Sequence, residues 1–210
     1  MSRRTAPSTP PNPSETERGD RYHHGDLRAA LLQAAAEALA EHGVGGLSLR
    51  DCARRVGVSH AAPYRHFASK EALLGALALQ GFAWLTAAGR AAMAEESTAL
   101  GRLHAYGRAY VRFAIDEPER FRLMFASPFS FECDDETPDA AAADEAYALL
   151  RDAAAAVSAA GVDADVAAVR YWSRPHGLAM LVLDGRIPAE RVADEASFAA
   201  LVEATLRDPV

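Results

Sequence analysis

The chain has 210 residues, half of them hydrophobic and about a quarter charged, as in a water-soluble globular protein. No run of about 18 apolar residues occurs, so we expect no membrane span. Cys52 and Cys133 lie far apart without metal-ligand spacing, which predicts a reduced, cytoplasmic setting with no metal and no cofactor. The net charge of −7 argues at first against a nucleic-acid partner.

The charge is distributed unevenly along the chain. Residues 1–75 contain 10 Lys and Arg against 8 Asp and Glu, whereas residues 76–210 contain 12 against 21. Residues 52–70 contain no acid, and four basic residues give this stretch a charge of +4. Because phosphate attraction acts within a Debye length of about 8–10 Å, local charge matters more than the global sign. The stretch is therefore a candidate DNA-binding surface.

The N-terminal part reads as a tail followed by a helix. Residues 1–20 are rich in Pro, Ser and Thr and poor in apolar groups, which predicts a disordered tail. From Asp26 to His42 apolar residues recur every four positions, and this spacing predicts an α-helix. Gly43 is the expected stop.

Three further helix starts follow within a short distance. Ser48 is the expected N-cap of a second helix, which ends at Gly57. Ser59 is the expected N-cap of a third, short helix that reaches about Phe67, and Ser69 that of a fourth. Two short helices joined by a glycine turn form a helix-turn-helix unit.

The remainder of the chain also has helical spacing, and no stretch alternates with the period of a β-strand. The fold class predicted is all-α with about nine helices. An N-terminal three-helix helix-turn-helix domain is expected over 21–70, and a helical ligand-binding and dimerisation domain over 71–210. Within the latter we expect a loop at 127–139 and helices at 98–116, from Pro118 to about 125, at 140–160, at 163–184 and at 194–207.

Residues 47–74 read LSLRDCARRVGVSHAAPYRHFASKEALL. This stretch resembles the DNA-binding signature of the TetR family of transcriptional regulators. The matching elements are Gly57-Val58-Ser59, Tyr64, His66-Phe67 and Ser69-Lys70-Glu71 followed by two leucines. The resemblance implies a transcriptional regulator that is not an enzyme. It further implies a homodimeric repressor that binds a near-palindromic double-stranded DNA operator and is released from it by a small-molecule effector. Trp172, His176 and Gly177 resemble the signature of a branch with a C-terminal Trp-His-Gly domain.

The third helix carries the predicted DNA contacts. Ser59, His60 and Ala61 lie at its start, where a recognition helix meets base edges in the major groove. The resemblance implies that Tyr64, His66 and Lys70 contact phosphates. It also implies that Arg50 meets the DNA backbone or a base. With the basic residue that precedes His66, the predicted DNA-binding set is Arg50, Ser59, His60, Ala61, Tyr64, Arg65, His66 and Lys70.

Each of these residues has a plainer alternative. Tyr64 would then belong to the core, and His66 would only end a helix. For Arg54 and Arg55, a position on a solvated helix face is the preferred interpretation over a DNA contact. Pro63 stands where the family often has leucine; because proline has no N–H, the cost expected is about one hydrogen bond and a slight shift in how the helix begins.

The resemblance also implies a ligand pocket and a dimer interface in the C-terminal helices. Apolar candidates for the pocket are Met124 and Met180 together with aromatic residues, and Tyr110 and His176 are polar candidates. The alternative is that all of them are ordinary core. The predicted pocket residues are Tyr110, Phe113, Phe121, Phe125, Trp172 and His176. The dimer candidates on the last two long helices are Val169, Leu181, Phe198, Leu201 and Val202.

Two other classes of protein compete with a regulator. A metalloenzyme would need His23 and His24 to meet the acids of 134–139, but adjacent histidines on a helix point about 100° apart and do not share a metal easily. No Gly-rich phosphate loop or nucleophile elbow occurs. A helical scaffold without DNA function would leave the acid-free basic stretch unexplained.

Overall fold

The computed structural model of the protein describes residues 24–126 and 141–207. Within these ranges it contains α-helices, two 3-10 helices and no strand, so the all-α prediction is confirmed. The predicted tail, the predicted loop at 127–139 and Cys133 lie outside the described residues. The α-helices are α1 (His24–Gly46), α2 (Leu49–Val56), α3 (Lys70–Ala94), α4 (Ala99–Asp116), α5 (Pro118–Phe125), α6 (Ala142–Ala155), α7 (Ala164–Leu183) and α8 (Glu195–Leu206); the 3-10 helices are η1 (Pro63–Arg65) and η2 (Ala189–Arg191).

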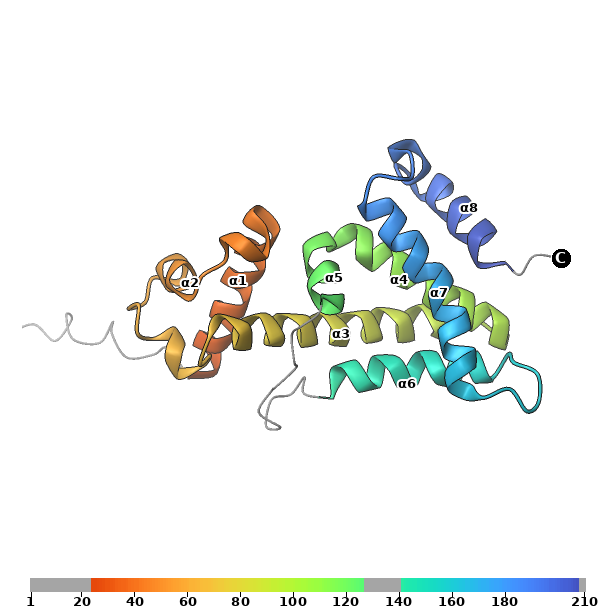
Figure 1. Cartoon of the computed structure of the whole chain (residues 1–210), viewed down its shortest axis with the longest axis horizontal. Coiled ribbons are helices and arrows are strands. Elements are labelled where there is room, and N and C mark those ends of the chain that lie inside the picture. The colour runs from red at the N-terminus through yellow and green to blue at the C-terminus, as the bar shows by residue number, and fades with distance from the viewer. Residues whose placement is uncertain (1–23, 127–140, 208–210) are drawn as a thin grey trace, which may run out of the picture.

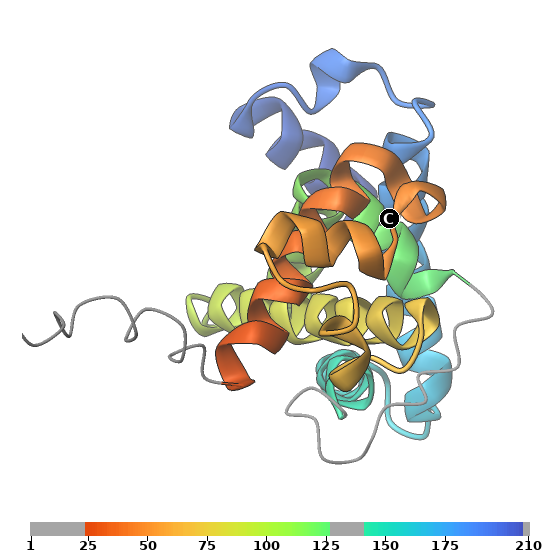
Figure 2. The same cartoon turned by 90° about the vertical axis from the view of Figure 1, so that its left-hand side faces the viewer.

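Helix α3 joins two lobes (Figure 1). The reading lobe consists of α1, α2 and η1 around the beginning of α3, and Figure 2 shows it end-on. The sensor lobe packs α4, α5 and α6 against the rest of α3, while α7 crosses α4 and α6, and α8 covers α4 and α7. The predicted boundary at residue 70 therefore falls where α3 begins, and α3 serves both lobes.

Helix α3 can join the lobes because it is apolar on nearly every side. By length and composition it is the one helix of the described ranges that could cross a membrane, yet 67% of its most apolar window is buried inside the protein. A core helix has the same composition. Gly89 lets α4 approach closely, because a Cβ there would lie 2.6 Å from the ring of Tyr106.

Two of the predicted serine N-caps are confirmed. The Ser48 hydroxyl accepts a hydrogen bond from the Asp51 N–H, and the Ser69 hydroxyl accepts one from the Ala72 N–H. Gly57, with φ of 80°, ends α2 in the left-handed conformation. At Gly43, with φ of 64°, the backbone leaves the helical conformation, so the first helical run ends there as predicted, and a further short helical segment continues to Gly46.

The predicted third α-helix from Ser59 to Phe67 is wrong. The structure has only the 3-10 helix η1, which begins at Pro63, and Ser59 caps nothing. Pro63 has no N–H to donate to the Ser59 carbonyl, and its ring would clash with that carbonyl in an α-helix. The chain forms a turn instead, in which the Ala62 N–H donates to the backbone carbonyl oxygen of Ser59 at 3.0 Å. Pro63 is thus a helix breaker here, not the minor irregularity that was expected.

Replacing Pro63 by leucine is expected to extend the helix toward Ser59, because the new N–H can reach the Ser59 carbonyl. The expected readout is a shift of the Cα resonances of residues 60–66 toward helical values by NMR. Exposed Ala68→Leu is the control and is expected to leave them unchanged. Non-helical resonances in Pro63→Leu would show that the tertiary contacts, not the proline, hold the turn.

Candidate nucleic-acid interface and ligand cavity

Arg55 ties α1 to α2 within the reading lobe. Its guanidinium donates to the Glu41 carboxylate at 2.6 and 3.1 Å and to Asp51 at 2.8 Å. These bonds from Arg55 lower the pKa of Glu41 and of Asp51. Arg54 also donates to Asp51, at 2.5 Å. Two of the four cations of the acid-free stretch are therefore paired with acids outside it, and Arg55 is a structural tie between α1 and α2 rather than a solvated residue.

Most of the predicted DNA-binding residues lie on the surface of the reading lobe. Arg50, His60 and Arg65 are exposed, as are Ser59 and Ala61. Tyr64 is 51% exposed, so its core alternative is wrong, whereas Pro63 and Phe67 are buried beneath the turn. A turn thus presents these side chains, and their contact with DNA stays a prediction.

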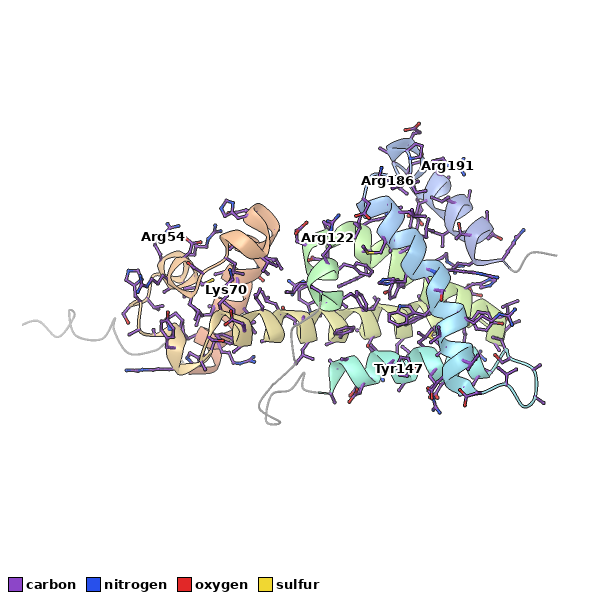
Figure 3. All side chains as sticks on the ribbon, in the orientation of Figure 1. Arg54, Lys70, Arg122, Tyr147, Arg186 and Arg191 are labelled. Carbon is purple, nitrogen blue, oxygen red and sulfur yellow. The ribbon has the colours of Figure 1, made fainter. Side chains whose placement is uncertain are left out.

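Lys70 and His66 are less open than the other members of the set. The Lys70 ammonium donates to the Val44 carbonyl at 2.6 Å, which ties α3 to the end of α1, and Figure 3 shows Lys70 in the reading lobe. His66 is half-buried and ends η1, with its backbone N–H donating to the Pro63 carbonyl at 2.9 Å. A phosphate contact by Lys70 would have to share the ammonium with this carbonyl.

The sensor lobe contains a cavity of about 270 Å³ between α3, α4, α5, α6 and α7. Of the predicted pocket residues, Tyr110, Phe125 and Trp172 line it, as does Met124. Phe113, Phe121 and His176 do not line it, and neither does Met180. The lining residues on α3 and α6 were not among the pocket residues predicted from the sequence. The full lining is Phe82, Leu85, Tyr106, Tyr110, Met124, Phe125, Ala143, Ala146, Tyr147, Leu150 and Trp172.

A polar relay lies at one wall of this cavity. The indole N–H of Trp172 donates to the Tyr110 hydroxyl oxygen at 3.0 Å, and that hydroxyl is 2.7 Å from Nδ1 of His176. Phe121 and Phe125 pack on the same side chains, with ring centroids 5.3 Å from Tyr110 and 5.0 Å from His176, respectively. Burial raises the pKa of Tyr110 and lowers that of His176, so both groups are neutral near pH 7.

The lowered pKa of His176 predicts a loss of stability in acid. In the unfolded chain His176 has its ordinary pKa of about 6.5, so below that pH the unfolded state takes up the proton first. The melting temperature is expected to fall as the pH drops from 7 through 6 and to level off once the folded state is also protonated. Differential scanning calorimetry should show that the melting temperature falls less steeply with decreasing pH in His176→Gln than in the control variant His42→Gln, whose histidine is exposed. Equal slopes in the two variants would show that His176 does not cause the acid sensitivity.

Helix α5 connects the cavity with the reading lobe. Its C-terminal residues Met124 and Phe125 line the cavity, whereas its first turn, from Pro118 to Arg120, borders a cleft of about 160 Å³ against α1. Arg120 is only 4% exposed and donates to Gln80 of α3 at 3.0 Å. One short helix thus contacts the cavity, the central helix α3 and α1.

In the described residues no three His, Cys, Asp or Glu side chains gather so as to hold a metal ion. The acids of 134–139 and His23, which the metalloenzyme alternative requires, lie outside those residues.

Comparisons with known proteins agree on one family. Residues 31–77 match "Bacterial regulatory proteins, tetR family" and residues 103–205 match "Tetracyclin repressor-like, C-terminal domain". An HTH-type transcriptional repressor of Mycobacterium tuberculosis is 44% identical over 52 residues, 25% of this chain and 28% of that protein. The chain thus spans 28% of the length of this curated relative in the match.

Two solved structures share the fold across both lobes. A protein of unknown function from Rhodococcus sp. RHA1 is 36% identical, with a TM-score of 0.69 over 90% of this chain and 97% of that one. AibR, solved with isovaleryl coenzyme A and operator DNA, is 19% identical, with a TM-score of 0.61 over 86% and 98% of the two chains. The latter likeness shows the fold alone.

Proposed function

This chain belongs to the tetR family of bacterial regulatory proteins and is a DNA-binding transcriptional regulator, and we propose that it acts as a homodimeric repressor that a small-molecule ligand releases from its operator. The observation that carries the proposal is the pairing of an exposed, basic reading surface in one lobe with an apolar cavity in the other. We place the protein in the cytoplasm, where its DNA is.

Helix α5 supports a route from ligand to DNA. A ligand in the cavity would press on Met124 and Phe125, and α5 would transmit the displacement to α1 through its first turn. A change in the spacing of two reading lobes need be coupled by only about 1–3 kcal/mol to weaken operator binding roughly 5- to 150-fold. AibR was solved with both a coenzyme A thioester and operator DNA, which fits a sensor of this architecture.

The dimer is proposed to form through the exposed apolar face of α7. Val166, Val169 and Leu181 of α7 are 63%, 55% and 47% exposed, an apolar face that a second copy would cover. The sequence-based candidates on α8 need correction: Phe198 and Val202 are 2% and 0% exposed, because they pack inside their own protomer. A two-fold dimer places two reading lobes about one DNA turn apart and so requires a near-palindromic operator.

The experiment that tests this function is a gel shift with the intergenic DNA upstream of the gene, combined with sedimentation of the free protein. A retarded complex that weakens steeply with salt, and a sedimenting species of twice the chain mass, are expected. Failure of a confirmed dimer to retard that DNA at low salt would contradict the proposed repressor function. A monomer at micromolar concentration would reject the α7 dimer.

A further inference from the structure

The cavity of the sensor lobe indicates the chemical class of its ligand, because the residues described along its wall are uncharged and mostly aromatic. Eleven described residues line it, and none of them is charged. Six are aromatic, and the others are Ala, Leu and Met. Transfer of a charged group into such surroundings costs far more than transfer of a neutral one unless a partner of opposite charge is present. Among the residues that the structure describes, the lining supplies no such partner to an anion or to a cation.

The polar groups at the wall are already engaged with one another. The single indole N–H of Trp172 donates to the Tyr110 hydroxyl oxygen, and this hydroxyl also forms a hydrogen bond with His176. A hydroxyl has one donor and two acceptor sites, so Tyr110 retains capacity for one further hydrogen bond. Tyr147 also lines the cavity, and its hydroxyl donates to Asp165 of α7 at 3.1 Å (Tyr147 is labelled in Figure 3).

The carboxylate behind Tyr147 does not provide a cation site either. Arg151 donates to the same Asp165 oxygen at 2.9 Å, so this acid is already paired. Cation–π attraction from the aromatic wall would contribute about 0.5–2 kcal/mol, which is small beside the cost of burying an ammonium without a counter-ion. The chemistry of the wall therefore favours a neutral ligand over either charged form.

The size of the cavity sets the size of the ligand. Its volume of about 270 Å³ lies just below the range of roughly 300–1,000 Å³ that is usual for small-molecule pockets, so it suits a small ligand. We propose that the cavity takes an uncharged molecule of one or two fused rings that carries one neutral hydrogen-bonding group, such as a hydroxyl, against Tyr110. This inference rests on the proposed ligand-sensing function and specifies its ligand class.

Four naphthalene probes of nearly equal size test the inference: 2-naphthol, naphthalene, 2-naphthoate and 2-naphthylmethylamine. Binding to the full-length protein is measured at pH 7 by calorimetry and by the shift in melting temperature. We expect 2-naphthol to bind at least 10-fold more tightly than either charged probe and about 5-fold more tightly than naphthalene. Equal or tighter binding of the naphthoate or the amine, or no binding of any probe, would overturn the inference.

Two variants locate the binding in the cavity. Ala146→Leu places a larger side chain on the cavity wall and is expected to reduce 2-naphthol affinity at least 10-fold, whereas Ala148→Leu on the exposed face of the same helix leaves it unchanged. Tyr110→Phe is expected to bring the affinities of 2-naphthol and naphthalene to within 2-fold of each other. A retained preference in Tyr110→Phe would contradict the hydroxyl's role.

The same samples separate the ligand class from the proposed function. Gel shifts without probe report DNA binding, and gel shifts with 2-naphthol report release. Protein that retards DNA but binds no probe would overturn the ligand class and leave the regulator intact. Protein that binds 2-naphthol with the expected preference yet stays on its operator would support the ligand class and contradict ligand-driven release.

Discussion

Replacement of Arg50 and Arg65 together by alanine is expected to weaken binding of every DNA duplex by roughly 100-fold at about 0.1 M salt. Both side chains are exposed on the reading lobe, and neither is among the arginines paired with acids there. A proposed dimer would lose four phosphate partners, so the plot of log affinity against log salt is expected to flatten by about 3–4. Titration of labelled duplexes at several salt concentrations measures both quantities.

The matched control removes the same charge from the other end of the molecule. Arg186 and Arg191 are exposed in the sensor lobe, far from Arg54 and Lys70 (Figure 3). Their double replacement by alanine is expected to change affinity less than 3-fold and to leave the salt dependence unaltered. If both double variants weakened DNA binding equally, net charge rather than the reading surface would be responsible, and the predicted contact set would be wrong.

Replacement of Arg120 by alanine is expected to lower the free energy of unfolding by about 2–4 kcal/mol. The side chain is 4% exposed, and its guanidinium lies 4.3 Å from the ring centroid of Trp84. It also donates to Glu117 at 3.2 Å and to Gln80 at 3.0 Å. Alanine removes these bonds and leaves a void between α3 and α5, so both the packing and the link between the lobes are weakened.

Urea unfolding followed by circular dichroism measures this loss, and Arg90→Ala is the control. Arg90 lies on α3, but its side chain is 59% exposed and pairs with Glu145 at the surface. Surface ion pairs contribute about 0–1 kcal/mol, so the control should lose no more than that. A loss in Arg120→Ala as small as that of the control would show that the buried guanidinium stabilises nothing.

The helix ends and the exposed reading residues could be predicted because they depend on neighbours in sequence. A serine three residues before the N–H that it caps satisfies that donor wherever the helix packs, as Ser48 and Ser69 do. At Ser59 the capping signal is overridden by Pro63, although both effects are local. The missing N–H and the ring of a proline four residues on outweigh a cap, because a cap contributes only about 1 kcal/mol and an internal proline costs about 3.

The sequence alone thus determined the all-α class, the family, the two serine-capped helix starts and the exposure of Tyr64. Only the tertiary structure decided which aromatic residues line the cavity, because Phe113 and Phe125 have the same helical character and differ in what the neighbouring helices place in front of them. It also paired Arg55 with Glu41, 14 residues away. Side-chain partners across helices depend on crossing angles, and periodicity along one helix does not contain them.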